Sequence, residues 1–442
     1  MSDLKEYNFN KLYTMSSGIS SKPEQAGYGS PFVSFSTVFK NYFLPEILID
    51  YMNTSEQEQE IYSIKKGDVF LTRTSETIDE LGMSCVALKD YPKATFSGFV
   101  KRLRPNQTNI TYDKYIGFYL KSKFFRKTMT NNAIMTLRAS LNEDIFSYLK
   151  LYLPDYKTQK NSGDLLYLLN SKIELNNRIN AELEAMAKTL YDYWFVQFDF
   201  PFDFASTPLS TGAQGKPDKN GKPYKSSGGK MVWNEELKRE IPEGWEAGKI
   251  GDYSEVNSGF AFNSSWWKKE GVPVIKITNI QEDYTINLNA CSYVSDDKAE
   301  IAKDYTANPF DVVIAMTGAT IGKYAIIPDI KKKILINQRV GLFNLGNDPL
   351  LKLPFLINSL KLSYFRNSIF LISSGCAQPN ISADQINSIK IIFPPADLIY
   401  LYNNTLRSNF IKIINNQKEN LYLSKLRDWL LPMLMNGQAK AV

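Results

Sequence analysis

An alternation of apolar and polar residues marks a segment that occurs twice along the chain. Residues 29–38, GSPFVSFSTV, and residues 271–280, GVPVIKITNI, share the positions of their glycine, their proline and most of their apolar residues, at an offset of 271 − 29 = 242. A period of two residues is typical of a half-buried β-strand. The coincidence of this pattern indicates a repeat with one copy in each half of the chain.

Four more segments recur in the same order, which is the expected sign of an internal repeat. The offsets lie close together, for example 311 − 68 = 243 and 366 − 126 = 240. The matched segments are Ser17-Gly18 with Ser258-Gly259, Asp68-Val69 with Asp311-Val312, 124–126 with 364–366, and 140–154 with 380–394. Identity is low, but pattern and order agree, so we expect two copies of one mixed α/β domain.

A long helix is expected after each copy, over about 163–197 and about 397–435. The motif LYDYW at 190–194 returns as LRDWL at 426–430, at an offset of 426 − 190 = 236. Apolar heptad spacing favours a coiled coil, although a core-facing helix in a bundle would also explain either stripe. Two such helices, each closing one copy, favour an antiparallel pair. The first stripe contains Leu165, Leu169, Ile179, Leu183, Met186, Leu190 and Tyr193, interrupted by Lys172 and Asn176.

These patterns predict an α+β (mixed) fold. It has two pseudo-twofold related globules, each with a twisted β-sheet, separated by two long antiparallel coiled-coil-like helices. Residues 205–230 are rich in Gly, Pro, Ser and Lys, a composition typical of an exposed linker. The expected divisions are a first domain at 1–155, a helix at 156–200, a linker at 201–240, a second domain at 241–395 and a helix at 396–442.

Composition limits the classes of partner and the cellular compartment but indicates no specific chemistry. The 442 residues are 43% hydrophobic with a net charge of +6, and this mildly basic balance permits a polyanionic partner. The three cysteines have no metal-binding spacing, which favours a reducing compartment. The N-terminus lacks an apolar signal region and no run approaches 18 apolar residues. We therefore expect a cytoplasmic protein with no membrane association.

The stretch DVVIAMTGATIGKYAIIPD, residues 311–329, resembles a phosphate loop, because an apolar run is followed by Gly318 and Gly322-Lys323. A phosphate loop needs four residues between its glycines and a Ser or Thr after its lysine. Here three residues separate Gly318 from Gly322, and Tyr324 follows Lys323. The stretch therefore favours a tight strand–loop–strand, in which glycine allows a positive φ.

No motif for catalysis is present. The chain contains no histidine, which excludes Ser-His-Asp and Cys-His systems and histidine-ligated metals. The sequence has no G-x-S-x-G or G-x-G-x-x-G motif, and its only Pro-Pro, at 394–395, lacks the flanking residues of an amino-methyltransferase motif. We predict a binding protein with no catalytic residues and no metal site. An enzyme with an unrecognised carboxylate site and a coiled-coil scaffold remain as alternatives.

Several segments together resemble the specificity (S) subunit of Type I restriction–modification enzymes. The resemblance covers nearly the whole chain, is stronger in the second half, and includes both helix ends. It is carried by residues 258–262, SGFAF; 271–280; 311–323, with TGATIGK; 337–340, NQRV; 378–382, QPNIS; and 393–395, FPP.

The resemblance implies a function in DNA recognition for phage defence. Each target recognition domain would read half of a split, asymmetric sequence in double-stranded DNA. The helices would recruit two methyltransferase (M) subunits, which use S-adenosylmethionine for DNA methylation, and restriction (R) subunits, which use ATP and Mg, would join for cleavage. The chain itself would carry no cofactor and no chemistry. The same architecture serves bifunctional enzymes in which methyltransferase and nuclease share one chain.

Candidate contacts are polar or basic residues in loops, where side chains can pair with base edges or phosphates. In the first domain they are Ser34, Ser36, Arg73, Thr74, Arg102 and Arg138. In the second they are Lys276, Thr278, Asn279, Thr317, Lys323, Arg339, Ser374 and Gln378. Arg73 and Lys276 are the strongest candidates, because the repeat places them beside or within the loops. The residues expected to face protein partners are Leu183, Met186, Leu190, Trp194, Leu426, Trp429 and Leu430.

Overall fold

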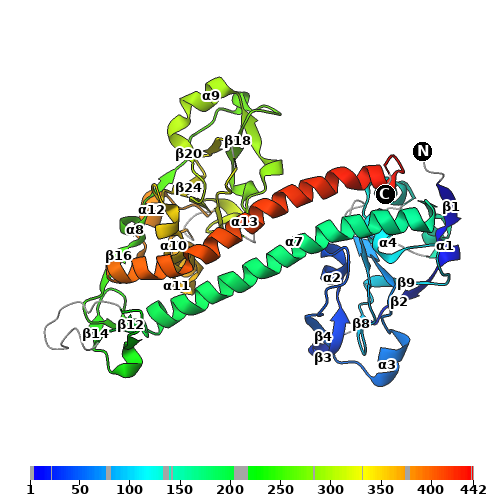
Figure 1. Ribbon diagram of the computed structural model, residues 1–442, viewed down its shortest axis with the longest axis horizontal. Coiled ribbons are helices and arrows are strands. Elements are labelled where there is room, and N and C mark those ends of the chain that lie inside the picture. Colours follow the sequence, from blue (N-terminus) through cyan, green and yellow to red (C-terminus); the bar gives the residue numbers. More distant parts are fainter. Residues whose placement is uncertain are drawn as a thin grey trace. The chain divides into compact units, whose positions relative to one another are not determined.

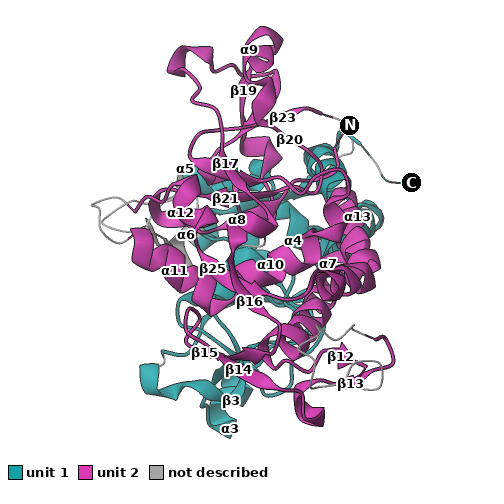
Figure 2. Ribbon diagram, turned by 90° about the vertical axis from the view of Figure 1, so that its left-hand side faces the viewer, with its two compact units in different colours: residues 1–174, 421–442 teal, residues 175–420 magenta. Residues whose placement is uncertain are grey.

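The computed structural model divides into two compact units. Unit 1 comprises residues 1–174 and 421–442, and unit 2 comprises residues 175–420 (Figure 2). Each unit thus contains one copy of the repeat and parts of both long helices. The structure describes residues 4–20, 22–75, 81–132, 139–140, 143–203, 218–281, 284–330, 332–373, 379–439 and 441.

Unit 1 is built on two small sheets. The antiparallel sheet has the order β2 (Tyr13–Ser17), β9 (Val100–Pro105), β5 (Val69–Thr72), β7 (Ser84–Val86). The mixed sheet has the order β4 (Asp50–Met52), β3 (Ala26–Val33), β8 (Thr95–Phe96), with β3 and β8 parallel. Strand β1 (Lys5–Asn8) pairs with β11 (Lys150–Leu153), and β6 (Thr74–Ser75) with β10 (Ala139–Ser140). The helices are α1 (Phe9–Leu12), α2 (Phe35–Lys40), α3 (Glu56–Ile61), α4 (Asp113–Tyr119), α5 (Lys123–Asn132) and α6 (Glu143–Tyr148).

Unit 2 repeats this topology, which confirms the predicted duplication. Its antiparallel sheet has the order β17 (Val256–Ser258), β24 (Val340–Phe343), β21 (Val312–Ala315), β22 (Tyr324–Ile326). Its mixed sheet has the order β19 (Ser292–Val294), β18 (Val272–Ile275), β23 (Ile334–Ile336), β20 (Thr306–Ala307), with β18 and β23 parallel. Strand β16 (Glu246–Lys249) pairs with β25 (Lys390–Phe393). The helices are α8 (Ile250–Tyr253), α9 (Asp296–Ile301), α10 (Leu353–Lys361), α11 (Ser363–Ser373) and α12 (Ala383–Asn387).

Part of the stretch that we expected to be an exposed linker is folded. Strand β12 (Pro201–Phe202) pairs with β13 (Lys222–Pro223), and β14 (Met231–Asn234) pairs with β15 (Arg239–Pro242). The Tyr224 ring stacks on Phe200 with centroids 4.8 Å apart, and both are buried. A few aromatic residues are therefore enough to order a stretch whose composition is that of a linker. Residues 204–217 lie outside the described residues.

Two long helices follow the two domains, as predicted (Figure 1). Helix α7 runs Tyr156–Tyr191 and continues as a π-helical turn at Asp192–Val196, and α13 runs Ala396–Met435. Helix α7 begins at the first residue of the expected segment 156–200, and Gly163 lies inside it. A Cβ at Gly163 would lie 2.7 Å from the backbone nitrogen of Tyr115, so this glycine allows α7 to pack closely on α4. No helix in the described part of the chain is long and apolar enough to cross a membrane.

The contact between α7 and α13 is polar in one stretch and aromatic in another, where Tyr191 of α7 packs on Tyr402 of α13 with ring centroids 5.9 Å apart. In unit 2, the Asn176 amide donates to Oε2 of Glu419 at 2.8 Å and to Oδ1 of Asn420 at 2.9 Å. About one turn further along α7, the Asn416 amide donates to Oδ1 of Asn180 at 2.8 Å. Residue numbers rise along α7 as they fall along α13, so the helices are antiparallel, as predicted.

The predicted stripe is confirmed only in part. Asn176 interrupts that stripe in the sequence, yet its side chain is fully buried. Met186, which belongs to the stripe, is 60% exposed. Helix α7 packs against a globular domain as well as against α13, and heptad spacing alone does not show which face makes which contact.

Each long helix completes the core of the domain that belongs to the other copy of the repeat. In unit 2, the end of α7 places Tyr191 and Phe195 in the core, where Phe195 meets Phe355 at a centroid distance of 5.1 Å. In unit 1, the end of α13 places Leu434 and Met435 in the core. Neither copy of the repeat has a complete core without the helix that follows the other copy.

A buried aspartate holds the start of the central strand in both units. Asp68 accepts from the Lys65 backbone nitrogen at 2.8 Å, and Asp311 accepts from Asn308 at 2.9 Å. In unit 1 an arginine joins it, because Arg104 donates from Nε and Nη2 to the two oxygens of the fully buried Asp68 at 2.8 and 2.7 Å. A two-bond contact of this kind is among the stronger ion-pair geometries.

We expect Arg104→Ala to destabilise unit 1 by about 3 kcal/mol, because it leaves the buried Asp68 carboxylate without its cation. Hydrogen exchange of unit 1 amides measures this locally. The matched control is Arg407→Ala, which breaks the more exposed ion pair with Asp348 and should cost under about 1 kcal/mol. Equal losses in the two variants would contradict this account.

A lysine lies over a loop tyrosine at equivalent positions of the two units. The Lys121 ammonium is 4.9 Å from the ring centroid of Tyr42, and that of Lys361 is 5.0 Å from Tyr284. Lys121 also donates to the Asn41 carbonyl at 2.6 Å. Burial is the largest cause that lowers the pKa of Lys121, to about 8. The folded unit therefore holds this proton less tightly than the unfolded chain does.

This lowered pKa predicts a stability that rises with pH. Between about pH 8 and 10.5 the unfolded chain binds a proton at Lys121 that the folded state has lost, so unfolding becomes less favourable. The free energy of unfolding of wild type minus that of Lys121→Met should rise by up to about 3 kcal/mol across this window. Urea unfolding at several pH values measures it, and a difference independent of pH would contradict the prediction.

Candidate nucleic-acid interface

The two sheets of unit 2 meet at one edge, where four loops are tied together by backbone hydrogen bonds. Asn337 donates to the Ile275 carbonyl at 3.0 Å, Gln338 to Phe260 at 2.9 Å, and Met316 to Arg339 at 3.0 Å. We call residues 258–260, 276–279, 316–318 and 337–339 the loop edge of unit 2. These bonds join the ends of strands from both sheets, so the side chains of the edge project from a well-supported backbone.

Unit 1 has the same edge with the same hydrogen bonds. Ser97 donates to the Val33 carbonyl at 3.0 Å, Gly98 to Ile19 at 2.7 Å, and Arg73 to Phe99 at 2.8 Å. The loop edge of unit 1 comprises residues 17–19, 34–36, 73–74 and 97–99. The positions differ by 240 to 243 residues from their partners in unit 2, for example 337 − 97 = 240 and 316 − 73 = 243, as the sequence repeat predicts.

A glycine in each unit permits this close approach of chains. A Cβ at Gly18 would lie 2.2 Å from the Ser97 carbonyl oxygen, and one at Gly259 would lie 2.3 Å from that of Ile336. Such distances are shorter than any real Cβ contact, and the clashing atoms are backbone. The repeated Ser-Gly pair in the sequence is therefore explained by packing at the edge.

The hydrogen-bonded pair of positions at the centre of the edge carries different side chains in the two units. In unit 1 the pair is Arg73 and Phe99, and both side chains are exposed, Phe99 by 65%. In unit 2 the pair is Met316, which is buried, and Arg339, which is exposed. Each edge thus presents one arginine, but from opposite sides of the same backbone hydrogen bond.

The other predicted contacts of unit 1 lie in different settings. Ser36 is exposed on the loop edge, and Ser34 caps α2 by accepting from the Thr37 nitrogen at 3.2 Å. Arg102 is 8% exposed and donates to the Ser63 carbonyl at 2.5 Å. A guanidinium held in this way supports the sheet, so we leave Arg102 out of the proposed interface. Thr74 lies in strand β6, its side chain is outside the described residues, and so is all of Arg138.

In unit 2, Thr278 and Arg339 are exposed on the loop edge. Asn279 is buried and accepts from the Lys276 backbone nitrogen at 2.8 Å, so its amide shapes the turn. Thr317 lies on the edge with a buried hydroxyl that has no hydrogen-bond partner among the described residues. Ser374 and Gln378 lie outside the described residues.

Lys276 is positioned by an aromatic platform beside the edge. Its ammonium lies 3.6 Å from the ring centroid of Trp267, and burial lowers its pKa. Trp266 stacks on Phe260 of the edge, with centroids 5.9 Å apart. The corresponding stretch of the first copy, residues 20–26, has no aromatic residue, so this platform distinguishes the two units.

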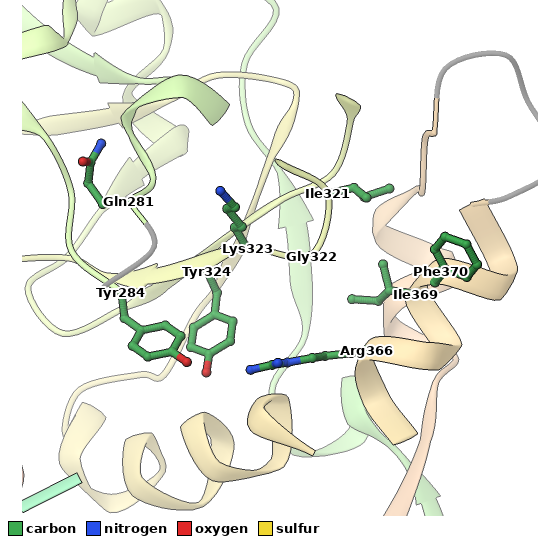
Figure 3. Close-up of a pocket in the computed structure, with 9 residues that line it drawn as sticks. All are labelled: Gln281, Tyr284, Ile321, Gly322, Lys323, Tyr324, Arg366, Ile369 and Phe370. Carbon is green, nitrogen blue, oxygen red and sulfur yellow. The ribbon is translucent and has the colours of Figure 1, made fainter. Parts of the chain in front are cut away.

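Lys323 follows the edge residues 316–318 in the same turn and lines a cavity of about 480 Å³. Figure 3 shows the Arg366 side chain extending toward the hydroxyl ends of Tyr284 and Tyr324, whose rings stack with centroids 4.8 Å apart. The backbone here is strand β21, a 3-10 turn at Gly318–Thr320 and strand β22, and Gly318 and Gly322 have φ values of +75° and +79°. The strand–loop–strand prediction is confirmed, and the helix that follows a phosphate loop is absent from this described stretch.

Four exposed residues of the edges were missing from the predicted set: Ser17, Phe99, Ser258 and Gln338. Phe99 is apolar, whereas the predicted contacts are all polar or basic side chains. Gln338 is exposed beside Arg339, and its counterpart by the repeat is Gly98, so comparison of the two copies gave no polar match. The signals available in the sequence were the position of Gln338 next to Arg339, the equivalence of Phe99 to Arg339 in the repeat, and the repeated Ser-Gly pair.

The helix residues expected to face protein partners divide into buried and exposed ones. Trp194 is 7% exposed and lies in the core of unit 2, and Leu430 packs against the core of unit 1. Leu183 is half-buried, and Leu190 packs against the core of unit 2. Met186, Leu426 and Trp429 are exposed, together with Tyr193 and Tyr422, which were not predicted.

No group of three or more His, Cys, Asp or Glu side chains that could hold a metal ion occurs among the described residues. The two edges offer arginine, lysine, hydroxyl, amide and aromatic side chains on duplicated supports. These are the groups that pair with base edges and phosphates. The fold and the edges therefore define a class of protein with two related nucleic-acid readers.

Comparison with known proteins identifies the family. Residues 9–185 and 242–421 match the family described as Type I restriction modification DNA specificity domain. The chain belongs to this family, so its function is DNA recognition in a Type I restriction–modification system, as a non-catalytic specificity subunit. The two matched segments correspond to the two copies of the repeat with the first parts of their helices.

Named relatives and a solved structure agree with this assignment. The specificity subunit of the Type I restriction enzyme HindI from Haemophilus influenzae is 26% identical and is matched over its whole length by 99% of this chain. The MjaIX specificity subunit from Methanocaldococcus jannaschii is 24% identical over 84% of each chain. The crystal structure of the S subunit from M. genitalium shares the fold with a TM-score of 0.58 at 13% identity, over 98% of this chain and 96% of that one.

The two edge arginines predict separable effects on DNA recognition. Arg73→Ala should relax base preference at positions in one half of the target, and Arg339→Ala in the other half. A lost base contact costs about 1–3 kcal/mol, or about 10-fold to 100-fold in discrimination. Binding to targets substituted at each position measures this.

The matched control for these variants is Arg178→Ala, an exposed arginine on α7, which should leave both halves unchanged. Uniform weakening on every DNA sequence in either edge variant would show that its arginine contacts phosphate rather than bases.

Proposed function

We propose that each unit reads one half of a split, asymmetric target in double-stranded DNA. The observation that carries this is the pair of positions joined by one backbone hydrogen bond, which is Arg73 and Phe99 in unit 1 but Met316 and Arg339 in unit 2. An arginine placed on opposite sides of the same junction reaches a different base position. Two readers on one scaffold then select two different half-sites.

The rest of each loop edge supports reading by direct contact. Arginine pairs in two-bond fashion with guanine in the major groove, and hydroxyl and amide groups such as those of Ser36, Thr278 and Gln338 pair with several bases. Lys276 and Lys323 provide positive charge for bases or phosphates. Exposed Phe99 suits apolar contact with a thymine methyl group.

The exposed apolar residues at the helix ends support two copies of one partner. Met186 and Tyr422 are separated by 422 − 186 = 236 residues, and they are 60% and 61% exposed. Tyr193 and Trp429 are separated by the same 236 residues and are also exposed. We call 186–190–193 and 422–426–429 the two docking stripes. Leu426 is exposed as well, whereas Leu190 is half-buried against the core of unit 2. Exposed apolar residues along one side of a helix fit a helix-binding protein surface.

The partners that we assign to these stripes are two methyltransferase (M) subunits. They would bring S-adenosylmethionine and flip an adenine out of the duplex, and restriction (R) subunits with ATP and Mg would then join. In this assignment the present chain supplies sequence choice and assembly, and its partners supply every cofactor.

The experiment that tests this function is a single-molecule methylome of cells with the chain and its M subunit, compared with cells that lack only the chain. A split motif of adenine methylation that disappears with the chain is the expected result. Methylation of a continuous motif, or a motif that persists without the chain, would refute the proposal.

Removal of one docking stripe should remove one partner copy. Trp429→Ala and Tyr193→Ala each delete an exposed aromatic from one stripe only. Each substitution should weaken the binding of one M subunit by about 2 kcal/mol, or roughly 30-fold in affinity, as for an aromatic interface residue. Native mass spectrometry would then show complexes with one M subunit.

The control is Leu168→Ala, an equally exposed residue of α7 outside the stripes (66% exposed), which should leave two M subunits bound. Full assembly with both aromatic variants, or loss of both copies from one variant, would contradict the assignment.

A further inference from the structure

An aromatic cluster beside the loop edge of unit 2 holds Trp267 in a fixed place. Its ring packs against Phe262, which is buried, with centroids 5.5 Å apart. The turn before it is capped by Asn263, whose Oδ1 accepts from the Ser265 backbone nitrogen at 3.0 Å. The residue after it, Lys268, donates from its backbone nitrogen to a carbonyl of strand β19 at 2.8 Å. The chain is therefore anchored on both sides of this tryptophan.

Lys276 of the loop edge lies on the face of this ring. Its ammonium is 3.6 Å from the ring centroid of Trp267, well inside the range of about 6 Å in which an aromatic face attracts a cation. Its backbone nitrogen donates to Oδ1 of Asn279 at 2.8 Å, so both ends of the residue are held. The residue is only partly buried, and a ring covers an ammonium from one side, so N–H donors remain available to a ligand.

A lysine that is held before it binds can choose between bases, whereas a mobile one cannot. The lysine side chain is a point charge on a flexible stem, and a free one adapts to the nearest phosphate whatever the sequence. An ammonium that is already fixed loses less entropy on binding and meets its acceptors at one place only. Guanine offers two acceptors in the major groove, O6 and N7. Trp267 therefore has the position needed to make the charge of Lys276 selective.

The first copy of the repeat has neither partner of this contact. Lys276 corresponds to Ser34, since 276 − 34 = 242, and no aromatic residue occurs at 20–26, the stretch that corresponds to that of Trp267. The backbone hydrogen bonds around the two edges are nevertheless the same. A contact that the shared fold needed would be expected in both copies. The contact of Trp267 with Lys276 is thus tied to what unit 2 reads.

We propose that Trp267 is a positioning residue for DNA recognition by unit 2, where it holds the Lys276 ammonium so that it reads a guanine in the half-site of this unit. This inference rests on the proposed reading of a split target and deepens it. Arg339 lies on the same edge, in a loop that is joined to the Lys276 loop where Asn337 donates to the Ile275 carbonyl. Lys276 and Arg339 then read two different positions of one half-site.

The test is competition binding of the complex assembled with its methyltransferase subunits, on duplexes substituted at each position of the target that the methylome defines. Lys276→Met should lower the preference for guanine at one position of the unit 2 half-site by about 10-fold to 100-fold. Trp267→Leu should lower it at the same position by about 10-fold, and Trp267→Phe by about 3-fold, because phenylalanine attracts a cation less than tryptophan does. The half-site of unit 1 is the internal control and should be read unchanged.

The double variant Trp267→Leu with Lys276→Met separates positioning from packing. If Trp267 acts through Lys276, the double variant discriminates between bases no worse than Lys276→Met alone. The matched control is Lys298→Met on α9, which removes a lysine 5.2 Å from the ring centroid of the neighbouring Trp266. This control should leave the preference at every position unchanged.

Wild-type discrimination in a folded Trp267→Leu or in Lys276→Met overturns the proposal. An additive loss in the double variant, or uniform weakening on every sequence, overturns it too, because the first indicates packing and the second a phosphate contact. If Trp267→Leu does not fold, Trp267→Phe keeps a ring in the cluster and decides, and an unchanged preference there contradicts the proposal. A wild-type complex without any split motif refutes the proposed function itself, which keeps the two failures distinct.

Discussion

The exchange of helix ends between the two copies of the repeat is the constraint on which the rest of the structure depends. The core of unit 2 needs Tyr191 and Phe195 from the helix that follows the first domain. The core of unit 1 needs Leu434 and Met435 from the helix that follows the second. Burial of a large apolar side chain contributes about 1.5–3 kcal/mol. Neither helix can therefore separate from the domain of the other copy without a large loss of stability. The two domains therefore depend on each other's helices for stability, and both keep the same fold.

On these matched supports, function depends on a few side chains that differ. The backbone hydrogen bonds of the two loop edges agree within a few tenths of an ångström, from Arg73 to Phe99 in one and from Met316 to Arg339 in the other. The aromatic platform under Lys276 adds a second difference. A duplicated scaffold holds the backbone constant while side chains change, which suits a protein that reads two different half-sites with one architecture.

The sequence was sufficient for the features that depend on order and local pattern. The repeat, its offsets near 240, the two long helices and the strand–loop–strand at Gly318 and Gly322 could all be predicted, because strand alternation, glycine positions and helix length are local properties. The resemblance of the motifs to a known family gave the function. The division of the chain into five segments and the roles of individual site residues remain predictions.

Side-chain roles that depend on tertiary contacts could not be predicted. Arg102 is basic and close to a loop, but its guanidinium is held by the Ser63 carbonyl. Trp194 lies in a helix motif that resembles a partner surface, yet its side chain is in a core. Asn176 interrupts a heptad pattern and is nevertheless buried at the helix contact. In each case the deciding partner is more than 35 residues away in sequence, so no local pattern identifies it.

The most direct test of the central claim is protection of guanine N7 from methylation along a target duplex bound to the assembled complex. This probe reports contacts in the major groove, where arginine meets guanine. Two short protected tracts, separated by a spacer in which the major groove stays reactive, are the result expected from two readers on one scaffold. A single protected tract, or continuous protection across the whole site, would contradict the account.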